Sequence, residues 1–182
     1  MFVARDARGE LVNVLEDKLE KQAYTCPACG GQLRLRQGPI VRPHFAHKSL
    51  KYCDYSSENE SPEHLTNKES LYHWLKRDSE VQLEYPLSEL KQIADVFVNG
   101  HLALEVQCSP LPQKLLKERS EGYRSHGYQV LWLLGQKLWL KDRLTRLQQG
   151  FLYFSQNMGF YVWEVDKEKQ LLRLKYLIHE DL

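Results

Sequence analysis

The chain has 182 residues, of which 27% are charged, and its formal net charge is +1 at pH 7. This length allows one sizeable domain with a small additional module, and the near-neutral charge excludes a global basic field as the means of binding nucleic acid. The N-terminus lacks the apolar core of a signal peptide, and no apolar run approaches the length that spans a membrane, so we expect a cytoplasmic protein.

Short strands are predicted near the N-terminus, over residues 2–4 and 11–14. Residues 24–57 differ in character, because they hold Cys, Gly, Pro, His and basic residues with little hydrophobic periodicity. A segment of this composition has too little apolar area to fold unaided, so we expect a stabilising cross-link, such as a bound metal ion. The polar residues 48–60 are predicted to form a linker.

Four cysteines occur in the chain, and their spacing is not that of a disulfide framework. Cys26 and Cys29 form a Cys-x-x-Cys pair, which in a reducing compartment indicates a metal site. Zinc favours four tetrahedral ligands from Cys and His. The two remaining ligands come from His44, His47 and Cys53. We expect His47 and Cys53 to bind Zn²⁺, with His44 as the alternative ligand.

Basic and aromatic residues gather around these cysteines. Such a surface can follow a phosphate backbone and stack a base, and it can equally be an ordinary solvated surface. The sequence leaves both interpretations open. The residues are Arg34, Arg36, Arg42, His44, Phe45, His47, Lys48, Lys51 and Tyr52.

A helix is predicted to begin at Ser61, since serine is a good N-cap and Pro62 suits the first helical position. Its first turn carries Glu63, which is either an acid stabilised by the helix dipole or a member of a metal site. A strand is predicted over residues 81–85.

A hairpin is predicted over residues 92–107, with an Asn-Gly pair in its turn. A two-residue turn, the usual interpretation of Asn-Gly, would strand Asp95 among apolar side chains. A three-residue loop over residues 99–101 makes one face entirely apolar and puts Asp95 opposite Glu105. Because register follows the face that must be buried, we expect the three-residue loop, with Gly100 in a left-handed conformation.

Two carboxylates in that position, Asp95 and Glu105, repel each other unless a cation lies between them. Hydrolysis of a phosphodiester needs such a cation, Mg²⁺ or Mn²⁺, to polarise the phosphate and to generate hydroxide from water. A half-exposed hairpin with solvated acids is the alternative, and the hairpin alone does not decide between the two.

Other residues can complete this site. Glu63 can complete or orient it, and Gln107 shares the face of Glu105. Gln107 can orient a water or a phosphate oxygen but supplies no charge, so we expect Lys68 or Arg119 to supply it. Arg119 and Tyr123 lie one helical turn apart, and an arginine in an apolar stripe needs a partner. That partner is a site acid, a substrate phosphate or a structural counter-ion.

The remaining elements predict an α/β fold. The helix that carries Arg119 is followed by an apolar strand, and such a strand-helix-strand crossover makes a parallel pair. We therefore expect a mixed sheet flanked by helices. The predicted elements are a helix over 111–126, a buried central strand over 129–134, a helical segment over 141–155 and a hairpin of strands 160–165 and 171–178.

These motifs resemble those of the competence protein CoiA family, and the likeness runs along essentially the whole chain. The motifs are Cys-Pro-Ala-Cys at 26–29, Pro-His-Phe-Ala-His at 43–47 with Cys53, Glu-Ser-Pro-Glu-His-Leu at 60–65 with Lys68, Ala-Asp-Val at 94–96, Glu-Val-Gln-Cys-Ser at 105–109, Glu-Arg-Ser at 118–120 with Gly122 and Tyr123, and Leu-Trp-Leu-Leu-Gly at 131–135.

The resemblance implies a zinc-finger-like module over residues 1–57 and a restriction-endonuclease-like domain of the PD-(D/E)XK superfamily over residues 58–182. On that pattern Asp95 and Glu105 match the metal-binding acids. Glu63 matches the acid on the first helix, and Gln107 the position usually held by Lys. The family is linked to natural transformation, acting on incoming DNA or its recombination. Its members are longer at the C-terminus, so we interpret this sequence as a short or truncated member.

We therefore expect a Mg²⁺- or Mn²⁺-dependent deoxyribonuclease, with DNA and recombination or competence proteins as its partners. The sequence leaves the preferred strand type of the DNA open. The alternative is a non-catalytic DNA- or protein-binding factor that keeps the nuclease fold and acts through its zinc module. The expected catalytic residues are Glu63, Asp95, Glu105 and Gln107, and the expected substrate-binding residues are Lys68, Arg119 and Tyr123.

Overall fold

The computed structural model describes residues 1–49, 51, 53, 55 and 60–179. The chain forms two compact units, the first of Met1–Glu60 with Gln82–Ala94 and the second of Ser61–Val81 with Asp95–Leu182. The predicted boundary between residues 57 and 58 lies outside the described residues and stays a prediction.

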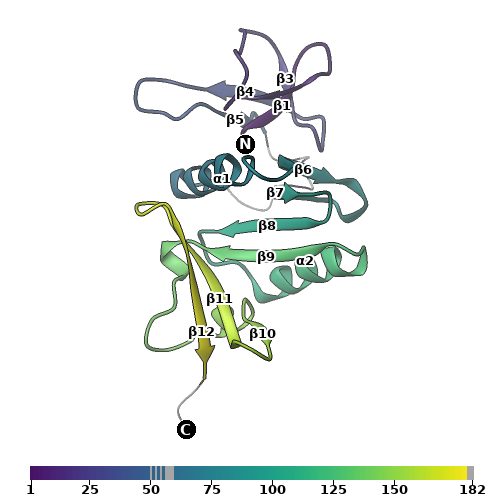
Figure 1. Cartoon of the computed structure of the whole chain (residues 1–182). Helices are drawn as coiled ribbons and strands as arrows, with labels where there is room; N and C mark the ends of the chain where they lie inside the picture. Colours follow the sequence, from purple (N-terminus) through teal and green to yellow (C-terminus); the bar gives the residue numbers. More distant parts are fainter. Residues whose placement is uncertain (50, 52, 54, 56–59, 180–182) are drawn as a thin grey trace. The chain divides into compact units, whose positions relative to one another are not determined.

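The first unit carries a five-stranded antiparallel sheet in the order β2-β1-β3-β4-β5 (Figure 1). Its small core is made by Ala4, Tyr24, Cys26, Leu33 and Phe45. Strands β3 to β5 lie where the sequence analysis found little periodicity, although Leu and Arg alternate along β4. The strands are β1 (Val3–Arg5), β2 (Leu11–Asn13), β3 (Tyr24–Thr25), β4 (Gln32–Arg36) and β5 (His44–His47).

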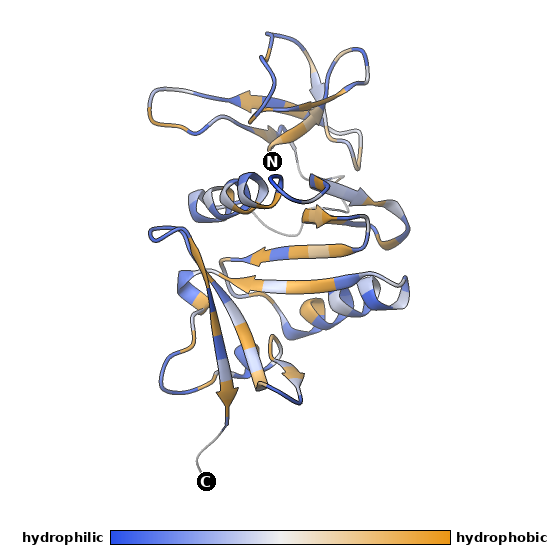
Figure 2. Cartoon of the chain, in the orientation of Figure 1, coloured by the Kyte–Doolittle hydropathy of each residue, from blue (hydrophilic) through white to orange (hydrophobic). Residues whose placement is uncertain are grey.

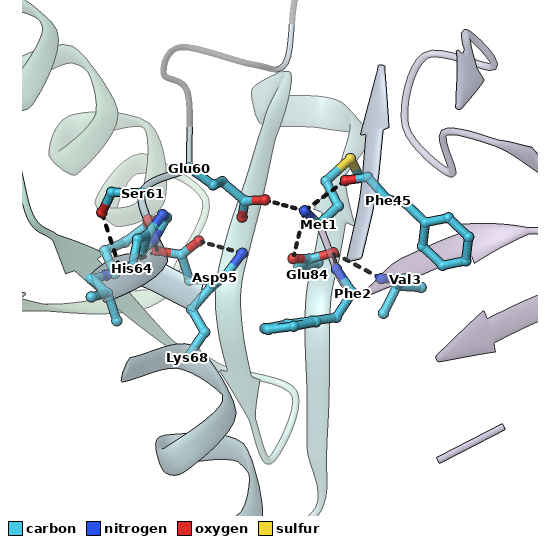
Figure 3. Close-up of polar contacts among 12 residues, drawn as sticks. Met1, Phe2, Val3, Phe45, Glu60, Ser61, His64, Lys68, Glu84 and Asp95 are labelled. Atoms are coloured by element: carbon cyan, nitrogen blue, oxygen red, sulfur yellow. Dashed lines mark hydrogen bonds and ion pairs between the residues drawn. The ribbon is translucent and has the colours of Figure 1, made fainter. Parts of the chain in front are cut away.

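A buried carboxylate explains why residues 82–94 belong to this first unit. Glu84 accepts hydrogen bonds from the backbone N–H groups of Phe2 (2.7 Å) and Val3 (3.0 Å). The amino group of Met1 lies against Glu84 as well, and it pairs with Glu60 (Figure 3). These contacts compensate the burial of Glu84 and attach its strand to the N-terminal sheet.

The larger sheet has the strand order β10-β11-β9-β8-β7-β6, with β12 paired to β11. Strand β9 is parallel to β8 and to β11, whereas β7 and β8 are antiparallel. The predicted mixed α/β sheet and its parallel crossover are thereby confirmed. The strands are β6 (Val81–Leu87), β7 (Gln92–Val98), β8 (Leu102–Gln107), β9 (Gln129–Leu134), β10 (Tyr153–Ser155), β11 (Gly159–Asp166) and β12 (Leu171–Ile178).

The hairpin of β7 and β8 has the predicted three-residue loop. Val98 pairs with Leu102, and Val96 with Leu104. Gly100 has a φ of +70° in the loop, as expected for a left-handed position. Burial of the apolar face selected this register over the tighter Asn-Gly turn.

Two helices flank the strands that carry the acidic residues. Helix α1 (Pro62–Leu75) begins as predicted, because the side chain of Ser61 accepts a hydrogen bond from the N–H of His64 (3.2 Å). Helix α2 (Gln113–Ser125) fills the crossover between β8 and β9. None of the described helices is long and apolar enough to span a membrane.

The predicted helix over residues 141–155 is wrong. The segment contains only α3 (Arg146–Gln149), one turn long, followed by strand β10, and the 3-10 helix η2 (Gln136–Leu138) precedes it. Thr145 and Gln148 form a capping box that starts the turn, and the Gln148 side chain also donates to the carbonyl of Leu138 (3.0 Å). This tertiary contact outweighs the helical propensity of the segment.

The loop conformation at Gly100 makes a testable prediction. Open space surrounds the position, but its positive φ disfavours a Cβ. Gly100→Ala should therefore lower the free energy of unfolding by about 1 kcal/mol, while Gly100→Asn costs less because asparagine tolerates the left-handed region. Urea denaturation measures both values. Equal stability of wild type and Gly100→Ala would contradict the register assignment.

Candidate functional site

Ionisable side chains from β7, β8, α1 and α2 gather within the second unit. Asp95 lies on β7, and Glu105 lies on the neighbouring strand β8. Continuing the observed pairing of Val96 with Leu104 places the two acids opposite each other. Each acid has its own set of partners, and the two sets come from different helices.

Asp95 is partnered by α1. Its Oδ2 atom lies 2.9 Å from Nε2 of His64, and its Oδ1 atom lies 3.7 Å from Nζ of Lys68 (Figure 3). Asp95 also accepts a hydrogen bond from the N–H of Val106 (2.9 Å). Burial by itself would raise the pKa of Asp95, but His64, Lys68 and this N–H outweigh it and hold the pKa at about 2. The carboxylate is therefore ionised at neutral pH.

Glu105 is partnered by α2. Its Oε1 atom accepts hydrogen bonds from Arg119 (2.9 Å) and from the hydroxyl of Tyr123. Burial and the nearby Asp95 raise the pKa of Glu105 to about 7, even though Arg119 and Tyr123 favour the charged form. The guanidinium of Arg119 also lies 5.2 Å from the ring centre of Trp132, which adds a cation–π contact.

Glu63 and Gln107, the other two expected catalytic residues, hydrogen-bond to backbone groups. Glu63 accepts a hydrogen bond from the N–H of Gln136 (2.7 Å), directly after Gly135. A Cβ at Gly135 would lie 2.9 Å from the Glu63 carboxylate and 2.7 Å from the Cys108 sulfur, so this approach requires glycine. Gln107 donates its side-chain N–H to the carbonyl of Ser109 (2.7 Å), and its side chain brings no charge to the acids.

The structure thus brings the predicted residues together as two groups, one around each acid. Lys68 lies against Asp95, and Arg119 with Tyr123 lies against Glu105. The carboxylate of Asp95 is a hard oxygen ligand of the kind that Mg²⁺ and Mn²⁺ accept. Glu105 can serve a cation as well, but the cation would share it with Arg119.

His64 was missed as a functional residue by the sequence analysis. It follows Glu63 in the first turn of α1, and its partner Asp95 is 31 residues away in the sequence. The available signal was its place in the first turn of a helix whose N-cap, Ser61, the sequence predicts. Its imidazole fixes one oxygen of Asp95 and is itself a potential metal ligand.

A second candidate metal centre lies in the first unit. Ligand atoms of Cys26, Cys29, His47 and Cys53 all lie within 4.8 Å of one another. These are the four residues that the sequence analysis expected. The alternative ligand His44 instead has its Nδ1 atom 2.8 Å from the carbonyl oxygen of Arg42. The cluster could hold a zinc ion, whose usual coordination is four such ligands.

Local backbone structure prepares this cluster. Gly30 has a φ of +70° and donates its N–H to the carbonyl of Cys26, and the N–H of Gly31 points to the sulfur of Cys29 (3.3 Å). A Cβ at Gly31 would lie 3.1 Å from that sulfur. Burial raises the pKa of Cys29 to about 12 and lowers the pKa of His47. A neutral imidazole suits a metal, and the metal's charge would favour the thiolates.

Two family models match the chain. The family described as "Competence protein CoiA, nuclease-like domain" matches residues 60–180, and "Competence protein CoiA, N-terminal domain" matches residues 11–56. The competence protein CoiA of Bacillus subtilis (strain 168) is 36% identical over 143 residues, which cover 76% of this chain and 37% of that protein. The chain thus spans well under half the length of this relative. No solved structure matches the chain.

The pKa of Glu105 makes a testable prediction. In the unfolded chain the group ionises near its ordinary value of 4.5, but in the fold it ionises near 7. The folded state therefore holds the extra proton, and this group's contribution to stability falls as pH rises from about 4.5 to about 7. Relative to wild type, Glu105→Gln should gain stability over that interval.

Chemical denaturation at a series of pH values, without added divalent metal, measures this difference. Glu118→Gln changes an exposed acid on α2 and provides the control, which should show no such trend. A constant difference between Glu105→Gln and wild type from pH 4.5 to 7.5 would mean that the pKa of Glu105 is not raised.

Proposed function

Because the chain belongs to the competence protein CoiA family, we propose that it is a divalent-metal-dependent deoxyribonuclease. It hydrolyses phosphodiester bonds of DNA during natural transformation and the associated recombination, in the cytoplasm and with recombination or competence proteins as further partners. The observation that carries the proposal is the meeting of Asp95 and Glu105 on adjacent strands, with cations from two helices around them.

Asp95 and Glu105 are the residues that would hold Mg²⁺ or Mn²⁺. Such an ion polarises the phosphate and lowers the pKa of bound water. Asp95 is suited to this role because its pKa of about 2 keeps it ionised. His64 orients Asp95, and Glu63 joins α1 to the N–H of Gln136 after β9, which positions the helix that carries His64.

Three further side chains are proposed to act on the substrate. Arg119 is the best placed, because 17% of its side chain is exposed and its guanidinium can donate to phosphate oxygens. Lys68 and Tyr123 are buried, so they contact DNA only if the site opens. While the site is closed, they fix the charge and orientation of the two acids.

Zn²⁺ is proposed as a structural ion held by Cys26, Cys29, His47 and Cys53. The small core of the first unit supports this role, since units of this size commonly need a metal staple. Metal binding and folding are then coupled, because the ligands are gathered at one place only in the folded chain.

A specific observation favours a second candidate, a non-catalytic DNA-binding factor. Gln107 stands where a cation is expected next to Glu105, and its amide donates to the carbonyl of Ser109. Without a charge there, stabilisation of the transition state falls to Arg119 and the metal ion.

Cleavage of labelled single- and double-stranded DNA distinguishes the two candidates. We expect cutting with Mn²⁺ or Mg²⁺, and none without added divalent metal. Asp95→Asn and Glu105→Ala should reduce cutting to the metal-free level, because each removes a proposed metal ligand. Glu118→Gln, an exposed acid paired with Lys114, should cut as wild type does. Circular dichroism verifies that each variant is folded.

Absence of cutting by the folded wild-type protein, at any metal concentration and on either strand type, would overturn the nuclease proposal in favour of the binding factor. Cutting that survives in both Asp95→Asn and Glu105→Ala would place the nuclease site elsewhere.

The zinc proposal is tested by metal content. Purified protein should contain one zinc ion per chain, and Cys29→Ala and His47→Ala should lose it. His44→Ala should retain it, because the His44 ring lies against the carbonyl of Arg42. Elemental analysis measures the ratio. Zinc retained by His47→Ala but lost from His44→Ala would exchange the roles of the two histidines.

A further inference from the structure

The hairpin of β4 and β5 has two chemically different faces. Leu33 pairs with His47, and Leu35 with Phe45, so these side chains lie toward the core and the cysteine cluster. Arg34 and Arg36 alternate with the leucines and project from the opposite face. Both arginines are exposed, and they stand two residues apart, about 7 Å along the strand.

Charge on this segment is entirely positive. Residues 21–53 contain no Asp or Glu, although the whole chain has a net charge of only +1. Arg34 and Arg36 have no ion-pair partner among the described residues. A local cationic strip with this spacing matches the repeating negative charge of a nucleic-acid backbone. The basic residues of the segment are Lys21, Arg34, Arg36, Arg42, Lys48 and Lys51.

The tip of the hairpin is apolar and exposed. Ile40 is 97% exposed and Val41 is 47% exposed, and Figure 2 shows this hydrophobic stretch within the loop that joins β4 to β5. Pro39 and Pro43 restrict the loop on either side. Two branched aliphatic side chains on a stiff basic loop are the side-chain type that proteins insert between base steps in a minor groove.

We propose that this hairpin, residues 32–48, binds double-stranded DNA, with Arg34 and Arg36 on backbone phosphates and Ile40 and Val41 as an apolar wedge in the minor groove. This inference rests on the proposal that DNA is the substrate, but it is independent of cleavage, because none of these residues belongs to the carboxylate site.

The kind of side chain at the tip favours a duplex over a single strand. Proteins that hold single strands stack bases on exposed aromatic rings. Every described aromatic side chain of the first unit is buried or half-buried, and Phe45 is only 1% exposed. Tyr52, an aromatic candidate from the sequence, lies outside the described residues.

Fluorescence anisotropy with a labelled duplex tests the proposal. The zinc-containing full chain is titrated at 50–200 mM salt without Mg²⁺ or Mn²⁺, so that binding is measured apart from cleavage. The slope of log K against log salt is negative, and each lost phosphate contact makes it less steep by about 0.9. The double variant Arg34→Ala with Arg36→Ala should therefore make the slope less steep by about 1.8, while Arg34→Lys with Arg36→Lys leaves it unchanged.

The wedge has a different signature. Ile40→Ala should weaken duplex binding roughly tenfold and leave the salt slope unchanged, since no charge is lost. Lys18→Ala is the control in the same unit, because this exposed lysine lies between Asp17 and Glu20 in the sequence. It should bind as wild type does.

Wild-type affinity and slope in the double alanine variant, or tighter binding of a single strand than of the duplex, would overturn the proposal. Duplex binding with these signatures but no cutting in the cleavage assay would leave this inference standing and remove only the nuclease proposal. Cutting with unaltered binding by the hairpin variants would do the reverse.

Discussion

A buried carboxylate, Glu105, and a half-buried one, Asp95, lie on neighbouring strands and impose the main constraint on the second unit. A buried acid is costly unless it is paired or hydrogen-bonded, and Asp95 and Glu105 also raise each other's cost by repulsion. Helix α1 supplies His64 and Lys68 to the first acid, and α2 supplies Arg119 and Tyr123 to the second. The contacts that attach both helices to the sheet are therefore also the contacts that set the chemistry of the site.

This arrangement makes the two acids unequal. Asp95 is held ionised, whereas the pKa of Glu105 is raised to about 7 by burial and by Asp95. Neighbouring acids with separated pKa values are typical of sites that handle protons or cations. Binding of a divalent cation would oppose the repulsion that raises the pKa of Glu105, so occupancy of the site and ionisation of this residue are coupled.

The first unit meets a different constraint, because its core is small. The carboxylate of Glu84 accepts hydrogen bonds from the first backbone N–H groups of the chain, and Cys26 belongs both to this core and to the cysteine-histidine cluster. The same register that turns Leu33 and His47 inward turns Arg34 and Arg36 outward. The near-neutral total therefore hides local charge: Asp95 and Glu105 lie together in the second unit, whereas Arg34 and Arg36 are exposed on the β4–β5 hairpin of the first.

The sequence by itself determined the β7–β8 register and the start of α1 at Ser61, because these follow from side-chain alternation and capping geometry. Ligand spacing narrowed the Cys and His cluster but left His44 open as an alternative to the residues that the structure brings together. Only the tertiary structure decided which cation serves which acid, the place of His64, the capture of the N-terminal amides by Glu84 across 82 residues, and the shortening of the predicted helix over 141–155. Periodicity tells which residues share a face, but it carries no information on which distant face they meet.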